Sequence, residues 1–342
     1  MIKIDIPESS KRIHKEKYYE SILYILNNIL SQSYVGYHNI HKKYFKEFNK
    51  LFESCNILIA SPEELDEFVH AEKQLVSRFW RKNRKRSKKV DYILSNIFSY
   101  ERFVQGRSIR LKGIIMPNES DNNVTWNAFD FLKSLNIRFC PYCNADTIFA
   151  TSIVKKDKTV KIKSAFDHYY PQSKYPYLAI SLYNLIPTCD RCNSNIKGNR
   201  ELSLKKNTHP YVDNFHDGIV FQNKIKTSTG FTGRTDSFEI KLVSRGKDKV
   251  LSEKAENTAR FFSIEQIYNA LFKEEAADVI KKIYIDVDSY RNHLKEQGIP
   301  PDQIDRLIWG CSLDPTQINQ NRLSKMIIDF VENGKTGNLL QS

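Results

Sequence analysis

The sequence predicts an α+β fold in which a small zinc-bound centre lies between a helical N-terminal region and a mixed, mainly helical C-terminal region. Apolar residues recur at helical spacing through about the first hundred residues. Two C-x-x-C pairs bracket the middle of the chain, and strand patterns followed by helix patterns occupy the rest. We therefore expect three regions, over residues 1–136, 137–215 and 216–342.

The N-terminal region carries two helix signals. Apolar residues at i, i+3, i+4, i+7 and i+8 predict one buried helix face: Ile22, Ile25, Leu26, Ile29 and Leu30. Further along, Ser61-Pro62-Glu63-Glu64 has the form of a capping box with proline at the first helical position. Another helix is therefore expected to start there and to run into the residues that follow position 80.

Short strands are expected in the middle of the chain. After a short helix at Trp126 to Leu135, residues 147–154 and 159–166 alternate β-branched and polar side chains around Lys156-Asp157-Lys158. This pattern predicts a hairpin. Residues 217–245 predict further strands, with turns near two glycines, Gly230 and Gly233.

The C-terminal part is expected to be helical. The helical pattern resumes at Ser252, and Ser263 with Gln266 has the form of a second capping box. Pro300-Pro301 interrupts this pattern, because proline cannot continue a helix. Two closing helices are expected at about 302–310 and 316–333.

The chain is basic, with 53 Lys and Arg against 40 Asp and Glu and a net charge of +13. Such an excess attracts polyanions through counterion release, so nucleic acid is the first partner to consider, although many proteins are simply basic. The N-terminus lacks the apolar run of a signal peptide, and no stretch approaches the roughly 20 apolar residues that span a bilayer. We expect a cytoplasmic protein with no membrane partner.

Four of the six cysteines form the two C-x-x-C pairs, Cys140 with Cys143 and Cys189 with Cys192. In a reducing compartment such knuckles bind metal in preference to forming disulfides. Four thiolates complete a tetrahedral zinc site and leave no position for water, so the zinc would be structural. The 45 residues between the knuckles must fold back on themselves to bring the pairs together. The other two cysteines have apolar neighbours and are expected to be buried: Cys55 and Cys311.

The insert between the knuckles holds a second pattern. Phe166-Asp167-His168-Tyr169-Tyr170-Pro171 is followed by Asn184-Leu185-Ile186-Pro187, and Asn193 comes directly after Cys192. With the knuckles, this order resembles the HNH (ββα-metal) endonucleases, whose pattern runs C-x-x-C, D-H-x-x-P, N-L, and C-x-x-C followed by H or N. The resemblance covers about 60 residues, near 140–200, and six or seven positions agree in order and spacing.

This resemblance implies a metal-dependent nuclease that hydrolyses phosphodiester bonds, with DNA favoured over RNA as substrate. It assigns His168 as general base and Asp167 as a carboxylate ligand of a catalytic Mg²⁺ or Mn²⁺. Asn184 would hold the intervening loop by hydrogen bonds to backbone, so that His168 points correctly. Asn193 would be the second metal ligand. The motif is therefore H-N-N, and an amide oxygen in place of an imidazole favours a hard, oxygen-preferring ion.

Several neighbouring residues allow two interpretations. Lys197, four residues after Asn193, would either neutralise phosphate or be solvated. Asn195 is a weaker candidate for the role of Asn193. For His209 and His216, packing or surface roles are favoured over a part in the site. Packing is also favoured over base stacking for the tyrosines of the insert: Tyr169, Tyr170, Tyr175 and Tyr177.

Seven of the nine residues 81–89 are basic. Beside a nuclease, this run is equally well explained as a solvated surface or as a set of phosphate contacts. The candidates for nucleic-acid binding are Arg84, Lys85 and Arg86.

Within the HNH class, the stretch from Asp167 to Pro176 with Asn184-Leu185-Ile186-Pro187 resembles the PtuB-like nucleases of bacterial Septu and related retron defence systems. That resemblance implies an antiviral effector that acts with an ATPase partner subunit (PtuA-like). The competing hypothesis is a zinc-stabilised adaptor that binds nucleic acid or protein without catalysis. The presence of all four motif residues favours the enzyme: Asp167, His168, Asn184 and Asn193.

Overall fold

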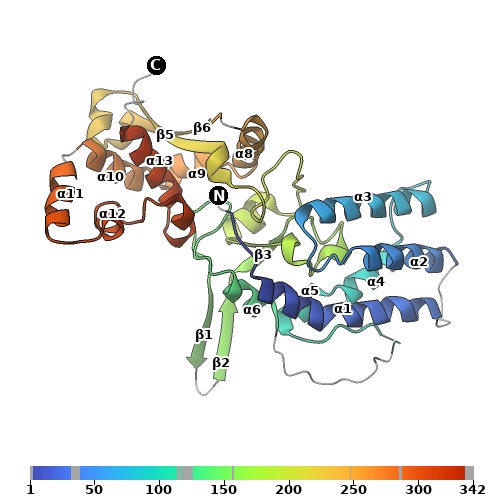
Figure 1. The fold of residues 1–342 in the computed structure, drawn as a ribbon. Coiled ribbons are helices and arrows are strands. Elements are labelled where there is room, and N and C mark those ends of the chain that lie inside the picture. Colours follow the sequence, from blue (N-terminus) through green and yellow to red (C-terminus); the bar gives the residue numbers. More distant parts are fainter. Residues whose placement is uncertain are drawn as a thin grey trace.

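The computed structural model describes residues 3–31, 39–112, 114, 116, 126–155, 158–246, 248–284 and 287–335, with residues 30, 31, 155 and 335 described by their backbone alone. The fold is mixed α+β, as the sequence predicts, and it is mainly helical. The N-terminal helices form one side of the molecule, and the C-terminal helices pack around a hairpin at the other side (Figure 1). Short strands lie between them.

The helical N-terminal region is confirmed. Its described helices are α1 (Glu8–Ser31), α2 (Asn39–Ser54), α3 (Pro62–Phe79), α4 (Lys88–Ile97), α5 (Tyr100–Gln105) and α6 (Ala128–Ser134). In α1 the expected apolar face is buried over Ile22, Ile25, Leu26 and Ile29, and Leu30 lies outside the described side chains.

The capping box at the start of α3 is also confirmed. The Ser61 side chain accepts from the Glu64 backbone N–H, and the Glu64 side chain accepts from the Ser61 backbone N–H. However, α3 ends at Phe79. The basic run 81–89 therefore does not continue α3: residues 81–87 form a turn, and Lys88 and Lys89 begin α4.

The predicted central hairpin is formed by β1 (Ala150–Lys155) and β2 (Lys158–Lys163), which pair antiparallel. It projects away from the rest of the molecule (Figure 1). The second strand is shorter than expected, because Ala165 and Phe166 belong to the next strand, β3 (Ala165–His168). After Lys163 the chain no longer pairs with β1, and β3 pairs with β4 instead. β4 ends directly before Cys189, so this pairing leads the chain back to the knuckles.

The centre consists of two short strands and one helical segment. β3 pairs antiparallel with β4 (Leu185–Thr188), so that Asp167 lies opposite Ile186 and His168 opposite Leu185. The loop between the strands contains two 3-10 turns, η1 (Pro176–Leu178) and η2 (Leu182–Asn184). The π-helical segment η3 (Arg191–Lys197) follows β4 and ends with a hydrogen bond from the backbone N–H of Gly198 to the Asn193 carbonyl.

The predicted strands of the C-terminal region are β5 (Ile219–Ile225) and β6 (Phe238–Ser244), an antiparallel pair. They are preceded by α7 (Phe215–Gly218) and joined through the 3-10 turns η4 (Ser228–Thr232) and η5 (Thr235–Ser237). The expected turn near Gly233 is present, and the left-handed φ of +73° at this residue suits glycine. The helices that follow are α8 (Lys249–Phe261), α9 (Ile264–Leu271), α10 (Lys273–Tyr284), α11 (Val287–Glu296) and α12 (Pro301–Trp309), then η6 (Pro315–Gln320) and α13 (Ser324–Lys335).

Two expectations for this region were wrong in detail. Ser263 does not cap α9: its φ is +52°, its side chain makes no capping hydrogen bond, and its backbone N–H bonds to the Arg260 carbonyl. The tight connection from α8 therefore sets the conformation of this serine. The segment 316–333 is also not one helix, because the 3-10 turn η6 ends at Gln320 before α13 begins.

One contiguous cluster of buried apolar side chains extends from Ile4 to Val331, so the three regions share a core. The backbone N–H of Ile4 also bonds to the Pro210 carbonyl at 2.7 Å, which ties the start of the described chain to the centre. Among the described residues, no helix is both long and apolar enough to cross a membrane.

Candidate active site and metal centre

The four cysteines of the two knuckles form one buried cluster. None of them is in a disulfide, and their four sulfur atoms all lie within 4.8 Å of one another. In a tetrahedral site with Zn–S bonds of about 2.3 Å, the sulfurs are about 3.8 Å apart. The Cys143 and Cys189 sulfurs are 3.9 Å apart. The donor set and its spacing fit a structural zinc ion.

Backbone contacts tie the first knuckle to the C-terminal helices. Asn144 follows Cys143 in the left-handed conformation, with a φ of +53°, and its side-chain oxygen accepts from the Lys325 backbone N–H at 3.0 Å. The Tyr268 hydroxyl donates to the Cys143 carbonyl at 2.7 Å. The cysteine cluster therefore lies where the centre meets α9 and α13.

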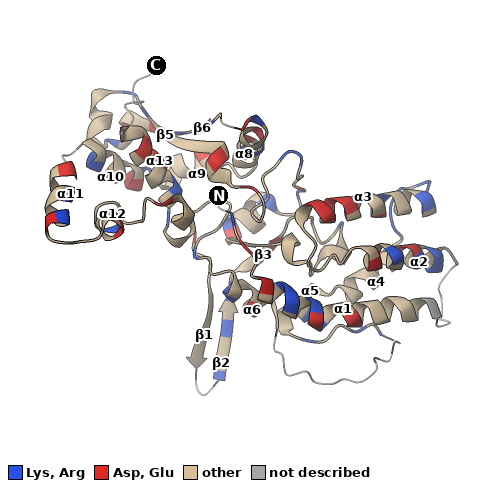
Figure 2. Cartoon of the chain, viewed as in Figure 1, with Lys and Arg blue, Asp and Glu red and all other residues tan. Residues whose placement is uncertain are grey.

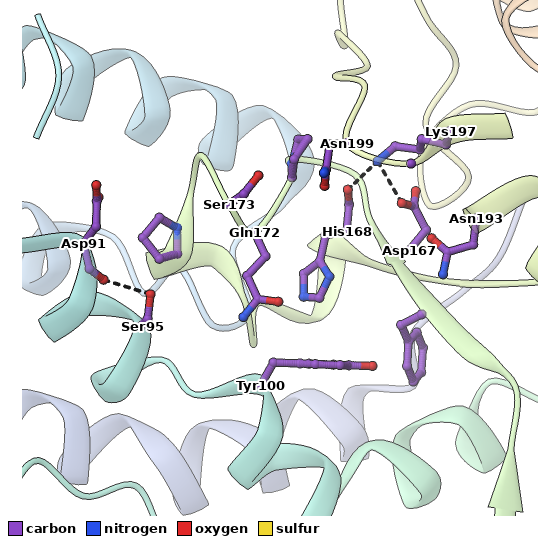
Figure 3. Close-up of a pocket in the computed structure, with 14 residues that line it drawn as sticks. Asp91, Ser95, Tyr100, Asp167, His168, Gln172, Ser173, Asn193, Lys197 and Asn199 are labelled. Atoms are coloured by element: carbon purple, nitrogen blue, oxygen red, sulfur yellow. Dashed lines mark hydrogen bonds and ion pairs between the residues drawn. The ribbon is translucent and has the colours of Figure 1, made fainter. Parts of the chain in front are cut away.

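A cavity of about 510 Å³ is lined in part by Asn193, the residue that follows Cys192 of the cluster (Figure 3). Four of the predicted site residues line it: Asp167, His168, Asn193 and Lys197. The opposite wall comes from α4 and α5, which contribute Asp91, Ser95 and Tyr100. The structure thus brings the centre of the motif and the N-terminal helices to one concave site.

His168 is held in one tautomer. Its Nε2 lies 2.9 Å from the Ala179 carbonyl oxygen, which only accepts, so Nε2 carries the proton and Nδ1 has a free lone pair. The Tyr100 ring packs edge-on against the imidazole at 4.8 Å. Burial lowers the pKa of His168 to about 4, so the imidazole is neutral at pH 7. A neutral imidazole with one nitrogen fixed and the other free is suited to accept a proton.

Asn184 makes the backbone hydrogen bonds that the sequence predicts. Its amide NH₂ donates to the carbonyls of Tyr170 and Leu178, at 3.2 and 2.9 Å, and its oxygen accepts from the Tyr170 N–H at 2.7 Å. The Leu178 carbonyl is one residue before the Ala179 carbonyl that holds His168. Asn184 therefore orients His168 through the loop without contacting its ring.

Asp167 is 2% exposed, and both of its carboxylate oxygens have a partner. Oδ1 lies 2.8 Å from the Lys197 ammonium, and Oδ2 accepts from the Tyr142 hydroxyl at 2.8 Å. Burial raises the pKa of Asp167, while Lys197 and Tyr142 oppose that shift. Tyr142 was not predicted; its position inside the first C-x-x-C knuckle was the signal available in the sequence.

Lys197 is not solvated in this structure. Its side chain is 1% exposed, and its ammonium donates to the His168 carbonyl at 2.7 Å as well as pairing with Asp167 (Figure 3). Phosphate contact stays a prediction, since Lys197 lines the cavity, but the solvated alternative is wrong. The cause is that η3 packs directly on β3, which places the lysine between two oxygens of that strand.

The donors for a catalytic divalent ion fit by their chemistry. Asp167 offers a carboxylate and Asn193 an amide oxygen in one cavity, and Mg²⁺ typically uses few protein oxygens together with water and phosphate. Asn195, the weaker candidate, is exposed and lies outside the cavity lining, whereas Asn199 lines it and was not predicted.

The three basic candidates of the turn after α3 divide into two kinds. Arg84 and Lys85 are exposed and remain available for nucleic acid. Arg86 has a side chain only 10% exposed, pairs with Glu72 at 2.8 Å and Asp91 at 2.6 Å, and donates to the Lys174 carbonyl. These contacts favour a structural role for Arg86. Acidic and basic residues both occur on each of α1 to α3, whereas β2 carries only lysines among its charged residues (Figure 2).

The N-terminal helices hold the loop between β3 and β4 at several points. His14 bonds to the Ile180 carbonyl at 2.8 Å, the Leu182 N–H donates to the Leu58 carbonyl at 2.9 Å, and Tyr170 donates to Asp66 at 2.8 Å. Sequence patterns gave no sign of these contacts, because they join segments more than a hundred residues apart. This loop carries the Ala179 carbonyl, so α1 and α3 help to fix His168.

The other histidines and the tyrosines have packing roles, as expected. His209 is buried against the Tyr169 ring at 4.3 Å, and His216 is buried near Asp329, 3.6 Å from its carboxylate. Neither histidine lines the cavity. The four insert tyrosines named above are buried: Tyr169, Tyr170, Tyr175 and Tyr177. Cys311 is buried as predicted, but Cys55 is only half-buried.

Comparison of the chain with protein-family models, with curated proteins and with solved structures gives no match.

Proposed function

We propose that this chain is a metal-dependent endonuclease of the HNH type that hydrolyses phosphodiester bonds of nucleic acid, with DNA favoured over RNA. One observation carries the proposal: Asp167, His168 and Asn193 meet in one cavity, and Asn193 directly follows Cys192 of the four-cysteine cluster. The order of β3, β4 and η3 is also the strand–strand–helix order of a ββα-metal core. The motif in the sequence and the cavity in the fold point to the same residues.

In this proposal His168 is the general base. The Ala179 carbonyl holds Nε2–H, so Nδ1 takes a proton from the attacking water. As the water oxygen bonds to phosphorus, the bond from phosphorus to the leaving oxygen breaks and negative charge grows on that oxygen. A divalent ion bound by Asp167 and Asn193 would supply the positive charge that stabilises it. Zinc at the cysteines would be structural.

A second candidate function is a zinc-stabilised adaptor without catalysis. The ion pair between Lys197 and Asp167 favours it, because the carboxylate that would bind the catalytic ion already has a cation. The same buried ion pair, next to the free Nδ1 of His168, is equally compatible with an enzyme that has not yet bound its divalent ion. We adopt this second interpretation.

Cleavage assays distinguish the two functions. The zinc-loaded protein is incubated with plasmid DNA and with RNA in Mg²⁺, Mn²⁺ or EDTA, with His168→Ala as the control for contaminating nuclease. The proposal requires cleavage that depends on the divalent ion and is lost in the variant. Binding without cleavage of either substrate, with or without an ATPase partner, would support the adaptor.

An antiviral role with an ATPase partner subunit is part of the proposal and follows from the resemblance alone. Its test is co-purification of the chain with the product of the neighbouring gene, followed by the same cleavage assay on the complex. An ATPase that co-purifies and changes the cleavage rate would support this role. An unchanged rate in the presence of that ATPase would count against it.

A further inference from the structure

We infer that Lys197 is an internal counter-cation of Asp167, and that a divalent ion must displace its ammonium to bind at this site. The inference rests on the proposed function, because it concerns the ion that the proposed reaction uses. It differs from the expectation that Lys197 simply contacts phosphate, since it gives the lysine a role before any substrate arrives.

The position of the ammonium is the first reason. The Lys197 ammonium lies 2.8 Å from Asp167 Oδ1 and 2.7 Å from the His168 carbonyl oxygen (Figure 3). A carboxylate oxygen and a carbonyl oxygen that converge on one point are ligands that a hard cation would also use. Lysine and aspartate are 1% and 2% exposed, so water does not screen their interaction strongly.

Steric factors alone do not exclude the ion, because a carboxylate oxygen has a second lone pair. The obstacle is electrostatic: an ammonium and a divalent ion on the same carboxylate repel each other at short range and low dielectric. Occupation by the divalent ion therefore favours a lysine whose ammonium has left Asp167. Lys197 also lines the cavity, so its displaced ammonium has space to move and a substrate phosphate as its next anionic partner.

Two features distinguish this pair from an ordinary buried ion pair. Lys325 and Asp329 form a second buried pair, with both side chains 0% exposed, but these residues do not line the cavity. Asn193 lines the cavity beside Asp167, and it offers an amide oxygen as a further ligand for an incoming ion. Lys325 is therefore a control for burial away from this cavity, and its partner Asp329 belongs to a second group of possible metal ligands, with His216 and Glu332.

The first experiment measures Mn²⁺ binding by calorimetry, without nucleic acid, to zinc-loaded wild type, Lys197→Met and Lys205→Met. Lys205 is an exposed lysine of the same region and serves as the matched control. Removal of the buried charge in Lys197→Met should increase Mn²⁺ affinity at least about tenfold, which corresponds to only a small part of the repulsion between two close cations at low dielectric. The affinity of Lys205→Met should equal that of wild type. An affinity for Lys197→Met equal to or weaker than that of wild type would overturn the inference.

The second experiment uses the wild-type protein, so it does not depend on the folding of a variant. Lysines are labelled with an amine-reactive acetylating reagent with and without saturating Mn²⁺, and the labelled peptides are quantified by mass spectrometry. Lys197 should become several-fold more reactive with Mn²⁺, while the exposed Lys205 keeps the same reactivity. Equal protection of Lys197 in both conditions would overturn the inference.

The two proposals fail in different ways. In one case the wild type cleaves with Mn²⁺, but Lys197→Met binds Mn²⁺ no more tightly and the labelling of Lys197 does not change with Mn²⁺. This result would overturn the inference and leave the proposed nuclease function standing. Absence of Mn²⁺ binding to wild type and to Lys197→Met, together with absence of cleavage, would overturn both.

Discussion

The Tyr142 hydroxyl donates a hydrogen bond of 2.8 Å to Asp167 Oδ2, and it thereby joins the first cysteine knuckle to the carboxylate of the cavity. Tyr142 lies between Cys140 and Cys143, and its ring stacks on Phe262 at 4.2 Å. A displacement of the knuckle is therefore expected to move Asp167. The Tyr142 side chain links the cysteine cluster to the candidate active site.

Tyr142→Phe should weaken this connection while keeping the ring in place. A buried carboxylate that loses one donor destabilises the fold by about 1–3 kcal/mol. We expect unfolding at lower urea concentration, retained zinc and weaker Mn²⁺ binding, with Tyr92→Phe as control because Tyr92 is 66% exposed. Equal stability and Mn²⁺ affinity in both variants would show that the hydrogen bond does not matter.

Cys143→Ser or Cys189→Ser should release zinc and destabilise the whole protein. A structural zinc site contributes on the order of 10 kcal/mol to folding in small zinc peptides, and this cluster joins the centre to α9 and α13. Zinc content by elemental analysis and thermal unfolding measure the effect. Cys55→Ser, at a half-buried cysteine outside the cluster, should keep both zinc and melting temperature. A zinc-free wild type would contradict the assignment.

Two buried histidines outside the cavity predict how stability depends on pH. Burial lowers the pKa of His14 and of His209 to about 3, so both are neutral in the folded protein at pH 5 to 7. The unfolded chain takes up a proton at each below about 6.5. Stability should therefore fall as pH decreases from about 6.5 towards 3, with a limiting slope of roughly 2.7 kcal/mol per pH unit for two protons.

The measurement is urea unfolding between pH 7 and 5.5 for wild type and His209→Phe. Phenylalanine retains a ring against Tyr169 but cannot be protonated. The free energy of unfolding should depend less steeply on pH in the variant, because up to about one proton fewer is taken up on unfolding. This difference is expected whatever the variant's absolute stability. Identical slopes would mean that His209 already titrates normally in the folded protein.

The basic turn after α3 allows a paired test of binding and stability. Arg84→Gln with Lys85→Gln should weaken nucleic-acid binding and reduce its salt slope by about 0.9 for each phosphate of duplex DNA that the variant no longer neutralises. Arg86→Gln should instead destabilise the fold by about 3–5 kcal/mol, because it leaves the fully buried Glu72 without its cation. An unchanged salt slope in the double variant would identify the turn as solvated surface.

Sequence reasoning recovered the parts of the site that are encoded by local spacing. The cysteine pairs, the Asp167-His168 dipeptide and the loop-holding role of Asn184 all follow from short motifs, and the structure places them together. The helices were recognised for a similar reason, since burial of one face imposes a 3.6-residue period, as in α1.

Interactions between distant segments could not be predicted in this way. Nothing in the spacing of Lys197 shows that η3 packs on β3 and buries its ammonium at Asp167. Arg86 lies inside a run that composition alone marks as surface, yet Glu72 and Asp91 draw it into the core. Ser263 failed as a helix cap for a local reason, because the tight turn after α8 holds it in the left-handed conformation, which overrides a sequence preference for capping.

His168→Ala is the most direct test of the proposed reaction. The change removes the proposed base but leaves the cysteine cluster and Asp167 in place, so the variant should fold, keep zinc and bind nucleic acid as wild type does. Cleavage should fall by at least the roughly 10²–10⁴-fold that general-base catalysis supplies. Asn193→Ala should also lose activity, but by weakening the divalent ion, so excess Mn²⁺ should restore part of it and should not rescue His168→Ala. Side-by-side time courses, alone and with any ATPase that co-purifies, measure these rates. If His168→Ala cleaves at the wild-type rate, the cavity is not the active site and the adaptor becomes the better description.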